Sequence, residues 1–100
     1  MGHSLKSRMF LVETRIADAA QGDIQALYEL GVAYSTGTGG VEIDVIEAHK
    51  WFNLAALNGS VLAQEARADI ADDMTAREIA EAQRQARAWL ADLADARRAA

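Results

Sequence analysis

Apolar residues recur every three or four positions along most of the chain, and this spacing places side chains on one face of an α-helix. In the first segment the recurring residues are Leu5, Met9, Val12, Ile16 and Ala19 or Ala20. Gly22 follows them as a helix stop. The pattern therefore predicts a first helix over residues 5–21.

Two more helices are predicted in the next part of the chain. Asp23 can cap a helix whose apolar face holds Ala26, Leu27, Leu30, Ala33 and Tyr34. A glycine-rich loop over residues 37–40 ends that helix. Asp44 and Glu47 then have the spacing of a capping box, and the following helical face holds Ala48, Trp51, Phe52 and Ala55. Residues 41–46 could also form a short strand, but no partner strand is indicated, so we favour the helix start.

The last part of the chain predicts a fourth and a fifth helix. Ser60 can cap the fourth, which runs to Asp72, and Thr75 with Glu78 forms a second capping box. The apolar face of the long last helix holds Ile79, Ala82, Ala86, Trp89 or Leu90, and Leu93. The chain also contains 22 alanines and no proline, and both features favour an all-α protein of about five helices.

The sequence repeats itself with a period in the high thirties. A shift of 37 residues superimposes four pairs: Ala19 on Ala56, Gly22 on Gly59, Ile24 on Val61, and Ala26 on Ala63. A shift of 38 superimposes Trp51 on Trp89. Two helices per unit at this period are typical of an α-solenoid, in which each helical hairpin buries its apolar face against its neighbours.

Thirteen positions in order resemble the Sel-one-like repeat (SLR) family, a relative of the tetratricopeptide repeat: Leu30, Gly31, Tyr34, Gly37, Gly39, Val41, Asp44, Ala48, Trp51, Ala55, Ala56, Gly59 and Ala63. The resemblance implies antiparallel helix pairs stacked into a right-handed superhelix that serves as an adaptor surface for other proteins. Gly40 departs from the family pattern as an insertion, and Arg67 and Ala68 stand where Leu-Gly is expected. The second repeat is therefore divergent.

The repeat pattern and the length of the chain predict a single domain over residues 1–100. It divides into an N-terminal helix over 5–21, a first full repeat over 23–58, and a divergent second repeat with a long C-terminal helix over 60–98. Residues 1–4 have the character of an added leader. The five alanines at 26, 48, 55, 56 and 63 are expected where neighbouring helices approach most closely.

Charge and composition exclude several classes of partner. Fifteen acidic and ten basic residues give a net charge of −5, and no more than two basic residues are adjacent, so nucleic acid is not an expected partner. No apolar stretch approaches the roughly 20 residues that span a bilayer, and no signal-peptide pattern is present. We therefore expect a cytoplasmic protein that does not enter membranes. The absence of cysteine excludes disulfides and thiol chemistry.

The sequence offers no assembled catalytic group. His49 is the only histidine outside the leader; its neighbours Glu47 and Lys50 point to other helical faces, so it is interpreted as exposed or packed at an edge. No histidine pair has metal-binding spacing, and the glycine loop lacks the lysine of a phosphate-binding loop. We expect no enzyme activity, catalytic residue, metal or cofactor.

The favoured function is therefore a non-catalytic protein–protein interaction module that binds a partner protein or peptide. Tyr28, Glu29 and Val32 are the candidate partner-binding residues, because they fall beside the core face of the second helix and that helix is expected to line the concave surface. They could instead be ordinary surface residues.

Two alternatives stay open. One is a small-ligand or enzymatic pocket around Trp51, His49 and Tyr34. The other concerns assembly. Fewer than two good repeats leave the apolar faces at the ends of a solenoid exposed to solvent. The terminal helices are therefore expected either to cap these ends or to mediate a homodimer.

Overall fold

The computed structural model describes residues 5–99, and their side chains from Phe10 onward. The described residues form five α-helices and no strand: α1 (Leu5–Ala20), α2 (Ile24–Thr36), α3 (Val45–Leu57), α4 (Val61–Ala71) and α5 (Ala76–Ala99). The all-α prediction is confirmed, and the strand considered for residues 41–46 does not form. The assignment of residues 1–4 to a leader and the side chains of Leu5 and Met9 lie outside the described residues.

Helices α2, α4 and α5 begin at the caps that the sequence indicates. The Asp23 carboxylate accepts a hydrogen bond from the Ala26 N–H at 3.0 Å, and the Ser60 hydroxyl accepts one from Ala63 at the same distance. Before α5, Thr75 and Glu78 bond reciprocally: each backbone N–H donates to the other's side chain, at 2.9 and 3.1 Å. This is a complete capping box.

The capping box predicted at Asp44 and Glu47 is only half formed. The Asp44 carboxylate accepts from the N–H groups of Ile46 and Glu47, both at 3.1 Å, so it caps α3. The backbone N–H of Asp44 instead donates to the carbonyl of Tyr34 at 2.9 Å, which ties the end of the loop back to α2. The Glu47 side chain is left to bond within α3.

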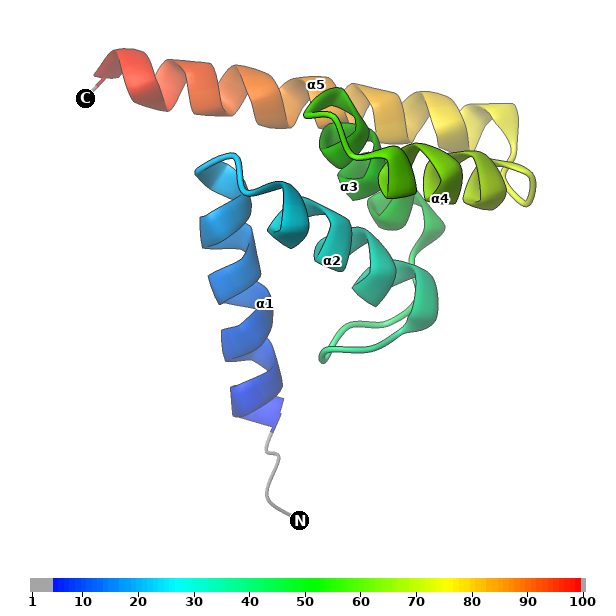
Figure 1. The fold of residues 1–100 in the computed structure, drawn as a ribbon, viewed down its shortest axis with the longest axis horizontal. Coiled ribbons are helices and arrows are strands. Elements are labelled where there is room, and N and C mark those ends of the chain that lie inside the picture. The colour runs from blue at the N-terminus through cyan, green and yellow to red at the C-terminus, as the bar shows by residue number, and fades with distance from the viewer. Residues whose placement is uncertain (1–4, 100) are drawn as a thin grey trace.

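The third helix lies at the centre of the fold. α2, α4 and α5 each pack against α3, whereas α1 packs against α2. Figure 1 shows α5 running along one edge of the molecule, with α1 set steeply to it and below its C-terminal half in this view. α4 and α5 approach each other less closely than either approaches α3. Ala68 stands in the second repeat where Gly31 stands in the first. Gly31 is buried against α3, whereas Ala68 is exposed.

Small residues mark the close approaches between helices. All five predicted alanines are buried: Ala26, Ala48, Ala55, Ala56 and Ala63. The tightest approach is at Gly31 of α2, where an added Cβ would lie 2.4 Å from Cδ1 of Phe52 on α3. Only a residue without a side chain lets the Phe52 ring pack directly on the α2 backbone.

None of the helices in the described part of the chain is long and apolar enough to cross a membrane.

Candidate interaction groove

An open groove of about 480 Å³ lies between α2, α3 and α4. Its apolar lining comes from all three helices: Tyr28, Val32, Val45, Phe52, Ala66 and Ile70. Because Tyr28 and Val32 are four residues apart on α2, they lie on one face of that helix, one turn apart. The groove therefore has a continuous apolar wall supplied by α2.

Phe52 forms the base of the groove and packs against Tyr28 of the wall. The rings of Tyr28 and Phe52 are 5.7 Å apart at an interplanar angle of 49°. Phe52 is only 3% exposed, while Tyr28 is half-buried and packs against the core cluster. The same Phe52 ring rests on Gly31, so the close approach of α2 and α3 fixes the position of the base.

One end of the groove is acidic. Asp69 on α4 and Asp73 in the turn before α5 line it, and both are exposed. Ser35 and Thr36, in the last turn of α2, line the same groove, and their hydroxyls donate to the Val32 carbonyl at 3.0 and 2.8 Å. Residues from the C-terminal ends of both α2 and α4 therefore line this groove.

Two of the three residues proposed from the sequence line this groove. Tyr28 and Val32 belong to its wall, but Glu29 does not. The Glu29 carboxylate lies 3.3 Å from Nε of Arg15 on α1, and it also accepts a hydrogen bond from Gln25 at 3.1 Å. Glu29 therefore links α2 to α1 rather than facing the groove.

The alternative site around Trp51, His49 and Tyr34 is not gathered at one cavity among those that the structure describes. Trp51 is buried and meets Trp89 of α5 edge to face, with ring centroids 4.9 Å apart. Tyr34 lies near Glu47 and Asp44, and its pKa is raised, first by burial and then by these carboxylates. His49 is two positions from Trp51 and lies near Arg67 of α4 instead.

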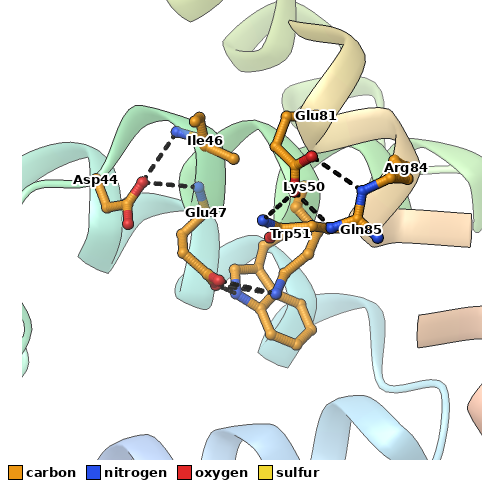
Figure 2. A network of polar contacts seen from close by, with 8 residues as sticks. All are labelled: Asp44, Ile46, Glu47, Lys50, Trp51, Glu81, Arg84 and Gln85. Atoms are coloured by element: carbon orange, nitrogen blue, oxygen red, sulfur yellow. Dashed lines mark hydrogen bonds and ion pairs between the residues drawn. The ribbon is translucent and has the colours of Figure 1, made fainter. Parts of the chain in front are cut away.

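Glu47 is the centre of a structural network on α3, shown in Figure 2. Its carboxylate accepts from Nζ of Lys50 and from Nε1 of Trp51, each at 3.0 Å. The Lys50 ammonium also lies 4.7 Å from the centroid of the Trp51 ring. These contacts satisfy the buried indole N–H and hold its ring against α5, so Glu47 has a packing role here.

The interpretation of His49 as exposed or edge-packed is wrong. Its side chain is 3% exposed, and Nδ1 is buried without a hydrogen-bond partner. Burial lowers its pKa, and the charge of Arg67 adds to the effect. His49 is therefore a buried residue that carries an unpartnered polar atom. The described residues also contain no cluster of three potential metal ligands.

Three polar residues of α5, half-buried Glu81 and Gln85 and exposed Arg84, pair with one another. Arg84 and Gln85 donate to the Glu81 carboxylate, as Figure 2 shows. The hydrogen bond from Arg84 is the main reason that the pKa of Glu81 falls to about 2. Exposed pairs of this kind add little stability. They form the solvated face that alternating charges typically indicate.

The groove lining also contains three residues that were not predicted as site residues from the sequence: Asp69, Ile70 and Phe52. A signal for Asp69 was present, because the shift of 37 residues that relates the two repeats places Asp69 on Val32. Equivalent faces of consecutive repeats therefore line one groove. No comparable signal was available for Phe52, whose place depends on the Gly31 contact.

The comparisons with known proteins identify one repeat. A family model described as Sel1 repeat matches residues 24–60, the stretch that holds α2, the glycine loop and α3. No curated protein and no solved structure matches the chain significantly. The matched repeat supplies two of the three helices that form the groove.

Proposed function

We propose that this chain, which carries a Sel1 repeat over residues 24–60, is a non-catalytic adaptor that binds a partner protein along the groove between α2, α3 and α4. Sel1 repeats generally mediate protein–protein interaction. The observation that carries the proposal is the groove itself, where Tyr28 and Val32 offer an open apolar wall above buried Phe52.

The groove has the physical character of a peptide-binding surface. Its base is fixed by helix packing, so a partner need not order it on binding, and that lowers the entropic cost of association. Its wall combines an aromatic ring with aliphatic side chains, and aromatic anchors are prominent among the residues that dominate binding energy. Both helices that flank the groove, α2 and α4, present their sides to it, so an extended or helical segment could lie along it.

The test is a charge placed inside the groove. Val32→Arg would put a long cationic side chain on the apolar wall, and it should abolish binding to peptides that the unaltered chain selects from a random twelve-residue display library. Gln64→Arg is the matched control, because Gln64 is an exposed α4 residue outside the groove lining. Helical circular dichroism should be the same for both variants. Selected peptides that bind Val32→Arg as tightly as the unaltered chain would overturn the proposal.

We also propose that the terminal helices associate with those of a second copy. Phe10 of α1 is 66% exposed and Leu90 of α5 is 46% exposed. Leu90 and Leu93 further line a hollow of about 150 Å³ between α5 and the turn that joins α1 to α2. Exposed apolar side chains on end helices support an interface with another solenoid surface.

A further inference from the structure

The acidic end of the groove points to the chemistry of its occupant. We infer that the groove selects a peptide segment in which apolar side chains are followed closely by a lysine or arginine. This inference rests on the proposed function, because it specifies the ligand of the same groove. Asp69 and Asp73 are the residues that would determine the specificity.

The first support is the charge of the lining. Asp69 and Asp73 are exposed, and no residue lining the groove is basic. Neither carboxylate takes part in an ion pair among the described residues. Both therefore remain available to a cation supplied from outside, and a second carboxylate at the same end adds to the attraction.

The second support is the direction of the helices. α2 and α4 are 13 and 11 residues long, and the residues of their last turns, Thr36 and Ile70, line the same groove. The C-terminal end of a helix carries partial negative charge from its aligned peptide dipoles. Two such ends beside two carboxylates make this region favourable for an ammonium or guanidinium group.

The third support is the position of the apolar lining beside the charge. Ile70 immediately follows Asp69 on α4, and Ala66 lies one turn before it. A lysine or arginine could lay its aliphatic stem along these side chains while its charged end reaches the carboxylates. An apolar residue a few positions away on the same segment would then meet Tyr28 and Phe52.

The overall charge favours the same kind of partner. The net charge of −5 attracts a cationic segment over longer range and raises its rate of association. An acidic segment would be repelled both by the net charge and by Asp69 and Asp73 at the groove. The inferred occupant is therefore apolar and basic rather than acidic.

The experiment uses the random twelve-residue library with the whole chain as bait. The unaltered chain should enrich peptides that carry lysine or arginine within a few positions of large apolar residues. The double variant Asp69→Asn and Asp73→Asn should still enrich apolar peptides but should lose the preference for basic residues. Asp72→Asn is the matched control, because it removes the same charge from the same end of α4 at a position outside the groove lining.

Affinities of one selected peptide measure the effect. Each Asp→Asn change in the groove should weaken binding by about 1.5- to 5-fold at low salt, the range for exposed ion pairs. The effect should shrink in 0.5 M salt, and Asp72→Asn should change affinity much less. If a melting curve shows that the double variant is destabilised, the single Asp69→Asn variant replaces it.

The outcomes separate the two proposals. Selected peptides without basic residues, bound equally by the double variant but lost with Val32→Arg, would overturn the inferred specificity and leave the groove as the binding site. Peptides that survive Val32→Arg would overturn the groove itself. A basic preference retained by the double variant would show that the cation is recognised elsewhere, and would also overturn this inference.

Discussion

Replacing Gly31 with alanine adds one methyl group at the closest approach of α2 and α3. The new Cβ would lie 2.4, 2.5 and 2.8 Å from Cδ1, Cε1 and Cγ of Phe52. Real Cβ atoms essentially never come this close to another side chain, so the Phe52 ring or the helices must move. The ring is 3% exposed and already packs on Tyr28, with centroids 5.7 Å apart. Its movement therefore disturbs both the core and the groove.

Two effects of opposite sign decide the result. Alanine is a better helix former than glycine by about 1 kcal/mol, which favours the variant. Overpacking a well-filled site costs about 1–3 kcal/mol, and three contacts below 3 Å place Gly31→Ala in the upper half of that range. The net expectation is a loss of about 1–2 kcal/mol in the free energy of unfolding. For a domain of this size, each kcal/mol lowers Tm by about 4–8 °C.

A double-mutant cycle isolates the contact. Phe52→Ala removes all three clashing atoms, so in that background Gly31→Ala should become stabilising by about 0.5–1 kcal/mol through helix propensity alone. Urea unfolding followed by circular dichroism gives all four free energies of unfolding. If Phe52→Ala unfolds too readily to measure, Phe52→Leu is the alternative background, with a smaller coupling of the same sign. Gly31→Ala that stabilises the unaltered chain, or that has the same effect in both backgrounds, would show that contact with Phe52 does not limit the residue at position 31.

Two further predictions concern the buried histidine and the ends of the fold. Because the folded pKa of His49 lies below its ordinary value of 6.5, the unfolded chain binds a proton more readily, so stability is retained above about pH 6.5 and falls as the pH drops below it. Urea unfolding at pH 8 and pH 5 should show this loss of stability. The variant His49→Leu, which also removes the unpartnered Nδ1, should lose less stability between the two pH values. An equal loss in the variant would assign the pH dependence to other groups. Sedimentation equilibrium at high micromolar concentration should show that the unaltered chain is a dimer. The double variant Phe10→Glu and Leu90→Glu should be a monomer, because both exposed apolar side chains become charged. A monomeric unaltered chain would contradict association through the terminal helices.

Local features of the fold were predictable because they depend on short-range interactions. The apolar spacing located all five helices. The starts of four of them were marked by caps, since a cap bonds a backbone group only two or three residues away: Asp23, Asp44, Ser60 and Thr75. The buried alanines followed from the repeat. Glu47 shows the limit: its spacing from Asp44 suggested a capping box, but the Trp51 indole N–H, which must be satisfied when buried, takes its carboxylate.

The groove was predictable only in part. Tyr28 and Val32, which line it, were chosen as candidate binding residues because helix periodicity places them off the core face of α2, and their binding role stays a prediction. The opposite wall was not assigned, because helical periodicity within α4 does not show which of its turns lies across from Val32. The shift of 37 residues between the repeats, which matches Asp69 to Val32, was not applied to this face. His49 was placed at the surface because only the packing of α4 over α3 buries it beside Arg67. Contacts between elements depend on how the helices are set against each other.

The most direct test of the groove as the binding site is an amide NMR titration of the labelled chain with a selected apolar and basic peptide. The shifts that change most should belong to Tyr28, Val32, Phe52 and Asp69, with their helical neighbours. Residues on the outer face of α5, such as Arg84, should not change. Changes confined to α1 or to the outer face of α5, with the groove residues unaffected, would show that the peptide binds elsewhere than in the groove.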